Sequence, residues 1–179
     1  MQKSFSIIGD VLVIINSSSF LPVYLRELKT ALTKFRLDIE YDYDFFLAGI
    51  SCHEKPYRLC WAINRAIGHD MAQTEPLSIA LKKTEAPSDF PVFKIFNKEN
   101  DTSIFLIANK TETTGAEEQP GIGLLIPEQN QADYFFIVKG PFNEHDLDQM
   151  MKNIREIPFV QLIYRINPSV LKSKENLLF

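Results

Sequence analysis

Residues 41–68, YDYDFFLAGISCHEKPYRLCWAINRAIG, contain the change of pattern that decides the fold. From Leu37 to Phe45, apolar residues alternate with acidic ones, which predicts a strand with one solvated face. A continuous apolar run follows, as expected where a strand enters a covered centre. Pro56 then opens a segment with apolar residues at helical spacing, and Gly68 is a suitable helix stop. The sequence therefore predicts a buried strand followed directly by an amphipathic helix.

The flanking sequence predicts more strands than helices, with short connections between them. Because consecutive strands with short gaps favour antiparallel pairing, we predict an α+β fold in two layers. It has a mainly antiparallel sheet of about six to seven strands, with two or three helices packed on one face. The longest loop is expected over Lys110–Gly121. Helices are predicted over 21–34 and from the Asn143 cap to Pro158, and further strands lie within 77–83, 90–96, 103–109, 121–126, 133–140 and 160–167.

The amino-acid composition limits the classes of protein to which this chain can belong. The 179 residues are 45% hydrophobic and 23% charged, which is typical of a globular domain and excludes disorder as the main state. The net charge of −4 is the wrong sign for general attraction to phosphates, so we expect no nucleic-acid partner. No apolar run approaches the length of a membrane span, so we expect no membrane association. Two cysteines are too few for a disulfide framework, and we expect a cytoplasmic location.

Three separated motifs carry a family resemblance. They are the run 41–64, the stretch LLIPEQNQADYFFIVKG over 124–140, and the tail LKSKENLLF over 171–179. Together they resemble the bacterial family called IPExxxVDY, named after its own motif, with Ala132 where that name has Val. The resemblance implies no particular reaction or cofactor. The motif positions matched in this sequence are Ile126, Pro127, Glu128, Asp133 and Tyr134.

The resemblance also suggests how the chain is organised. It runs from about residue 35 to residue 179, where we expect a single α+β domain. Residues 1–34 would form an N-terminal extension. Because they lie outside the resemblance, we hypothesise that translation begins at Leu32 from a non-ATG codon, so that residues 1–31 precede the native protein.

The most suggestive chemistry lies in the segment SCHE. Cys52, His53 and Glu54 offer a thiol, an imidazole and a carboxylate, which are the ligands that zinc prefers. No second ligand pair accompanies them at the usual spacing, so we expect no metal site. A nucleophilic Cys52 with His53 as its base is also disfavoured, because adjacent residues at a strand end point to opposite sides. Cys60 is expected to be a small buried hydrophobe.

A second candidate is the carboxylate pair of the family motif. Glu128 and Asp133 could act as paired acid and base. No histidine, lysine pair or glycine-rich loop accompanies them. A turn in which carboxylates accept hydrogen bonds from backbone N–H groups accounts for the same residues, and we favour that interpretation.

A third candidate is a surface patch on the first predicted helix. Arg58, Asn64 and Arg65 lie on its polar side, with Trp61 nearby. Together with Tyr57 they could form a small aromatic and basic recognition patch.

The chain ends on three large apolar residues, Leu177, Leu178 and Phe179. Chain ends are normally polar and mobile, so an apolar end indicates docking. We expect these residues to pack into a groove on their own domain rather than to bind another protein.

These patterns favour a non-enzymatic, cytoplasmic module that binds a protein partner or forms a homo-oligomer. We assign no catalytic residue, cofactor or metal ligand. Two alternatives stay open: an enzyme that uses Cys52 and His53, or Glu128 and Asp133, in a pocket, and a weak nucleic-acid or metal binder.

Overall fold

The computed structural model describes residues 5–7, 12–14, 45–81, 87–114 and 120–177. The chain divides into two compact units, Met1–Tyr41 and Asp42–Phe179. In the first unit, the strands β1 (Phe5–Ile7) and β2 (Leu12–Ile14) pair in antiparallel fashion. The helix predicted over 21–34 lies outside the described residues.

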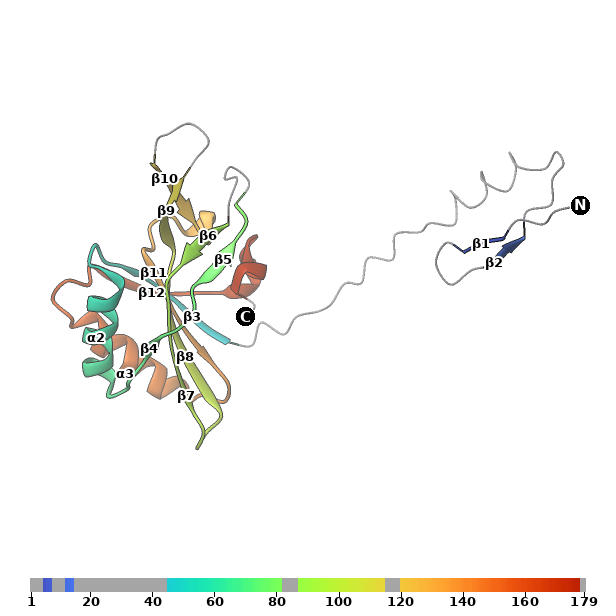
Figure 1. The fold of residues 1–179 in the computed structure, drawn as a ribbon. Helices are drawn as coiled ribbons and strands as arrows, with labels where there is room; N and C mark the ends of the chain where they lie inside the picture. Colours follow the sequence, from blue (N-terminus) through green and yellow to red (C-terminus); the bar gives the residue numbers. More distant parts are fainter. Residues whose placement is uncertain (1–4, 8–11, 15–44, 82–86, 115–119, 178–179) are drawn as a thin grey trace, which may run out of the picture. The chain divides into compact units, whose positions relative to one another are not determined.

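A six-stranded antiparallel sheet forms the centre of the second unit (Figure 1). This confirms the predicted α+β class. The strand order is β12-β3-β11-β8-β7-β4. The strands are β3 (Phe45–Ser51), β4 (Ala72–Gln73), β7 (Val92–Asn97), β8 (Thr102–Ala108), β11 (Tyr134–Lys139) and β12 (Leu162–Ile166).

The sheet is not a simple meander, because β11 lies between β3 and β8. Phe136 of β11 is opposite both Ala48 of β3 and Leu106 of β8. All three side chains are fully buried. The run YFFIVK is apolar on both faces up to its final lysine, which suits a strand with a neighbour on each side and a covered surface above and below.

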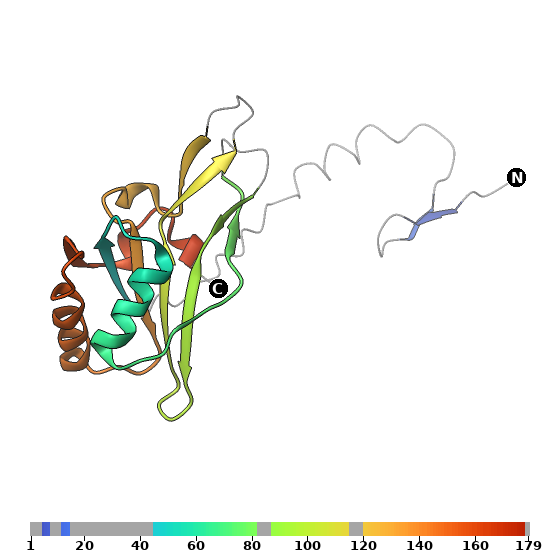
Figure 2. The same ribbon diagram turned by 60° about the vertical axis from the view of Figure 1, so that its left-hand side comes forward.

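Two helices, α2 (Pro56–Ile67) and α3 (Glu144–Arg155), cover one face of the sheet (Figure 2). Helix α2 begins at Pro56 and ends at Gly68, whose φ of 69° is left-handed, as predicted for a stop. Helix α3 begins after Asn143, whose side chain accepts a hydrogen bond from the backbone N–H of His145. It ends before Pro158, also as predicted.

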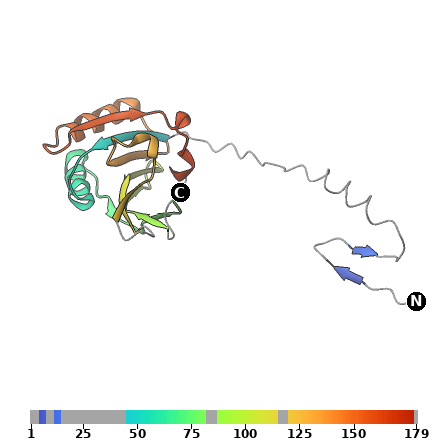
Figure 3. The ribbon, with the colours of Figure 1, turned by 90° about the horizontal axis from the view of Figure 1, so that it is seen from above.

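The opposite face of the sheet is buried as well, so the prediction of two layers was wrong. A second apolar cluster contains sheet residues such as Phe135 together with Phe90 and Leu125 from segments that lie over this face. The C-terminal turns lie away from α2 in Figure 3. The covering segments include β5 (Leu77–Ile79), β6 (Ser88–Phe90) and the 3-10 turn η3 (Lys174–Leu177). Two further 3-10 turns, η1 (Pro127–Gln129) and η2 (Pro168–Val170), contribute no buried residue.

The predicted long loop is largely a hairpin. β9 (Lys110–Thr114) pairs in antiparallel fashion with β10 (Pro120–Leu124), and residues 115–119 between them lie outside the described residues. The strand predicted within 121–126 overlaps β10, whereas β9 lies in the predicted loop and was missed. Its threonines favour a strand, but its polar composition gives no apolar alternation from which to predict one.

The C-terminal tail docks on the second face. Leu177 is fully buried in the second cluster, which confirms the expected docking for this residue, while Leu178 and Phe179 lie outside the described residues. Lys139 Nζ donates to the Leu177 carbonyl at 3.3 Å, and Asn176 Nδ2 donates to the Leu125 carbonyl at 2.8 Å. In the part of the chain that the structure describes, no helix is long and apolar enough to cross a bilayer.

Candidate functional site

The stretch 124–134 wraps around a buried side chain that sequence reasoning missed. Asn109, at the end of β8, is fully buried. Its Oδ1 accepts from the backbone N–H of Ile126 at 2.9 Å, and its Nδ2 donates to the carbonyls of Gln129 and Ala132 at 2.9 and 2.8 Å. One asparagine after an apolar strand gives no sequence signal for such a role. Asn109 therefore holds both ends of the connection between β10 and β11.

Asp133 of the motif joins the start of β11 to the end of β3. Its Oδ2 accepts from the Cys52 backbone N–H at 2.8 Å, and its Oδ1 accepts from Lys110 Nζ at 2.6 Å. Asp133 is largely buried, so the lysine offsets a charge that would otherwise be costly to remove from water. The carboxylate thus bonds to a backbone N–H group, as favoured from the sequence.

Tyr134, the next residue, makes a second link to the segment SCHE. Its hydroxyl donates to the backbone carbonyl of Glu54, whose carboxylate accepts from Arg58 Nη1 at 3.0 Å. Burial raises the pKa of Tyr134, so the phenol stays a neutral donor. We refer to Cys52, Glu54, Lys110, Asp133 and Tyr134 as the strand-end cluster.

The structure does not pair Cys52 with His53. Cys52 is 1% exposed, and burial raises the pKa of its thiol. His53 is exposed, and its Nδ1 is 2.9 Å from Gln161 Nε2. Cys60 is also buried and bonds to the Met71 carbonyl, and burial raises its pKa to about 11. Both thiols are therefore protonated near pH 7, which disfavours nucleophilic attack.

The structure also does not pair Glu128 with Asp133. Glu128, in η1 just after Pro127, accepts from the backbone N–H of Ser173 at 2.7 Å and from its hydroxyl at 3.1 Å. Partial burial raises the pKa of Glu128, but these hydrogen bonds outweigh it and the pKa is lowered overall. Glu128 thus holds the start of the C-terminal turn η3.

Among the residues that the structure describes, no three histidine, cysteine, aspartate or glutamate side chains gather closely enough to hold a metal ion. The strand-end cluster offers a single buried carboxylate that is already bound to a lysine and to a backbone N–H group.

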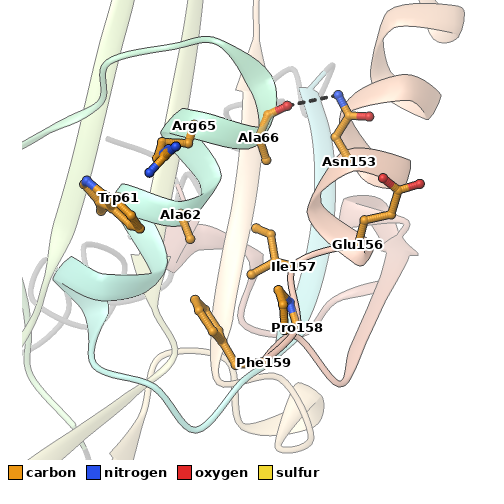
Figure 4. A pocket seen from close by; sticks show the side chains of 9 residues that line it. All are labelled: Trp61, Ala62, Arg65, Ala66, Asn153, Glu156, Ile157, Pro158 and Phe159. Atoms are coloured by element: carbon orange, nitrogen blue, oxygen red, sulfur yellow. Dashed lines mark hydrogen bonds between the residues drawn. The ribbon is translucent and has the colours of Figure 1, made fainter.

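A groove of about 500 Å³ lies between α2 and α3 on the outer side of the helix layer, and we call it the helix groove (Figure 4). Ala62 and Ala66 lie one helical turn apart on α2, so their small side chains leave a hollow along that face. The groove is lined by Trp61, Ala62, Arg65, Ala66, Asn153, Glu156, Ile157, Pro158 and Phe159.

Aromatic and basic side chains form one rim of the helix groove. Trp61 is 60% exposed, and the guanidinium carbon of Arg65 lies 4.9 Å from the centre of its ring. Arg58 stacks in the same way on Phe159, at 5.4 Å. Of the residues in the predicted patch, Tyr57 is also exposed. The structure therefore gathers most of that patch on one surface.

Asn64 departs from the predicted patch. Its side chain accepts from the Met71 backbone N–H and donates to the Met71 carbonyl, both at 3.0 Å, which anchors the chain after α2.

Neither a family model nor a curated protein nor a solved structure matches this chain.

Proposed function

We propose that this protein is a non-enzymatic, cytoplasmic interaction module, related to the IPExxxVDY family, that binds a segment of another protein in the helix groove. The observation that carries this proposal is the position of Trp61, exposed on the rim of a groove of about 500 Å³. Tryptophan and arginine are the residues most enriched where protein interfaces concentrate their binding energy.

The internal hydrogen bonds of the strand-end cluster favour a structural role for it over a catalytic one. An enzyme needs polar groups that are free to meet a substrate, with pKa values matched to proton transfer or attack. Here the carboxylate of Asp133 bonds to Lys110 and to a backbone N–H group, and the Cys52 thiol is buried. These side chains join β3 to β11, which is a structural task.

The supporting arguments for location and family come from the sequence. Both cysteines are free thiols, which suits a reducing compartment. The family resemblance rests on the three runs 41–64, 124–140 and 171–179, of which the second and the tail contact each other through Glu128 and Ser173. These contacts support a shared fold, and the first run, 41–64, also contributes Trp61 and Ala62 to the helix groove that we propose as the binding site.

A selection of displayed peptides tests the proposal. A random peptide library is selected on the full-length protein, on Trp61→Ala and on Phe96→Ala. Phe96 is 47% exposed on β7, so it is a matched aromatic control outside the groove lining. Peptides enriched on the wild type should bind Phe96→Ala equally and bind Trp61→Ala at least about 30-fold more weakly, as for an interface hot spot.

Thermal melting of each variant separates lost binding from lost folding. If a folded wild-type protein enriches no peptide that depends on Trp61, the proposal is wrong.

Sedimentation velocity over a range of concentrations tests whether a second copy of the chain occupies the helix groove instead. Self-association that Trp61→Ala abolishes would show that a second copy of the chain occupies the groove.

A further inference from the structure

We infer that the partner segment inserts an apolar anchor between an acidic and a basic residue, with the acid facing Arg65 and the base facing Glu156. This inference rests on the proposed function and specifies the partner's chemistry. It follows from three features of the helix groove: its floor, its two charged rims, and the hydrogen bond that sets the spacing of the two helices.

The floor of the groove selects the anchor. Ala62 and Ala66 of α2 face Ile157, which follows α3, and Phe159 closes one end (Figure 4). All four are apolar, and the two alanines leave the space that larger residues would fill. A leucine or phenylalanine side chain of a partner would cover this surface and remove it from water.

Arg65 selects an acidic residue. Its guanidinium stacks on Trp61, a contact that uses one face of the plane and leaves the N–H donors at its edge. Two other arginines of the helix layer and sheet are paired with carboxylates: Arg58 with Glu54, and Arg165 with Glu144 and Asp148. No described residue forms an ion pair with Arg65. A partner carboxylate can therefore accept two parallel hydrogen bonds from it.

Glu156 selects a basic residue on the opposite rim. It caps the C-terminal end of α3, is exposed, and forms no ion pair within the described part of the chain. Figure 4 shows Glu156 and Arg65 on opposite sides of the hollow. Because they do not pair with each other, a segment that lies between them meets one charge of each sign.

A hydrogen bond between the helices fixes the width of the groove. Asn153 Nδ2 of α3 donates to the Ala66 carbonyl of α2 at 3.0 Å (Figure 4), and Asn153 Oδ1 accepts from Gln149 Nε2 at 2.8 Å. Both ends of this amide are bound within the protein. The spacing of the two helices is thus fixed before binding, so a partner does not have to order the backbone on either side of the groove.

The charges favour a polypeptide over a nucleic acid. Trp61 and Arg65 could stack on an unpaired base. Glu156 would then lie close to a phosphate backbone, and the chain carries a net charge of −4, so the electrostatic attraction that single-strand binding requires is weak. A segment with both charge signs satisfies both rims.

The test uses peptides from the selection on wild-type protein, synthesised as found and with the acidic or the basic residue made neutral. Trp61 is the only tryptophan, so its fluorescence reports on the groove directly. We expect Arg65→Gln to weaken binding about tenfold, which is about 1.4 kcal/mol, and Arg65→Lys to weaken it less. Lys98→Gln, a charge control in the turn after β7, should bind like the wild type. Glu156→Lys should weaken binding of the original peptide, and a peptide whose basic residue is replaced by glutamate should restore binding to this variant.

The outcomes separate the two proposals. If peptides require Trp61 but bind Arg65→Gln and Glu156→Lys as tightly as the wild type, the charge pattern is wrong and the proposed function stands. If no peptide requires Trp61, both are wrong. If oligothymidylate quenches Trp61 at lower concentration than any peptide, the groove binds nucleic acid and both are wrong.

Discussion

The strand-end cluster and the helix groove differ in how their polar groups are satisfied. In the cluster, Asp133 and Tyr134 each bond to groups within the fold, and Cys52 is buried. In the groove, Trp61 is exposed, and neither Arg65 nor Glu156 has an ion-pair partner among the described residues. Residue types that suggest chemistry thus lie where they hold the fold together, while the groove lined partly by alanines leaves Trp61, Arg65 and Glu156 exposed.

The largest expected effect concerns the buried thiols, one of which, Cys52, belongs to the strand-end cluster. Cys52 and Cys60 should react with a thiol reagent at pH 7 orders of magnitude more slowly than free cysteine, because both are buried and burial raises both pKa values. Labelling in increasing urea should follow the unfolding transition. A Cys52 that reacts faster than free cysteine in the folded protein would restore the enzyme hypothesis.

Replacing Asn109 tests whether the motif is structural. Asn109→Ala leaves the Ile126 N–H and the Ala132 carbonyl without their side-chain partner, while the Gln129 carbonyl keeps its bond from the Ala132 N–H. Because each buried polar group left unpaired costs about 1–3 kcal/mol, the free energy of unfolding should fall by about 4 kcal/mol. Urea denaturation measures it. Asn64→Ala loses two bonds at a half-buried site and should cost less, and equal costs would contradict a special role for Asn109.

The docked tail should contribute nearly as much as Asn109 to the free energy of unfolding. Leu177→Ala removes a fully buried side chain from the second cluster, which should lower the free energy of unfolding by about 3 kcal/mol. The melting temperature should therefore fall by several degrees. Val170→Ala is the control, because Val170 is 72% exposed and its loss should change stability by less than about 0.5 kcal/mol. A Leu177→Ala protein that melts like the wild type would contradict tail docking.

A smaller, pH-dependent effect is expected from Glu128. Its pKa in the folded state is lowered relative to the unfolded chain, so it stabilises the fold above its unfolded pKa of about 4.3 and loses this effect as pH falls through the folded value. Glu128 is largely exposed, so Glu128→Gln should cost less than about 1 kcal/mol at pH 7. The difference in melting temperature from wild type should shrink as pH falls below about 4.3 and vanish once pH is well below the lowered folded-state pKa. A difference that grows on acidification would contradict this sign.

The smallest effect on stability is expected in the helix groove. Trp61→Ala removes an exposed side chain and should change the free energy of unfolding by less than about 0.5 kcal/mol, although it removes peptide binding. Calorimetry and peptide titration on the same sample measure both. A strongly destabilised Trp61→Ala protein would place Trp61 with the structural residues and remove the contrast between the two regions.

The local elements could be predicted because their signals are local. The apolar run before Cys52 predicted β3, and Pro56 and Gly68 bracketed α2 as they do in the structure. Asn143 was identified as a cap because a polar side chain can accept from an N–H two residues later without help from distant parts of the chain. The α+β class followed from the same periodicities.

Only tertiary structure decided which segments meet. The bond from Cys52 to Asp133 joins positions 81 apart in sequence, and the insertion of β11 between β3 and β8 creates it. Glu128 bonds to Ser173 rather than acting with Asp133, because the tail packs over the second face of the sheet. The helix groove likewise requires α2 and the end of α3 side by side. Periodicity fixes which face of an element is apolar, but the choice of partner depends on how all such faces are buried together.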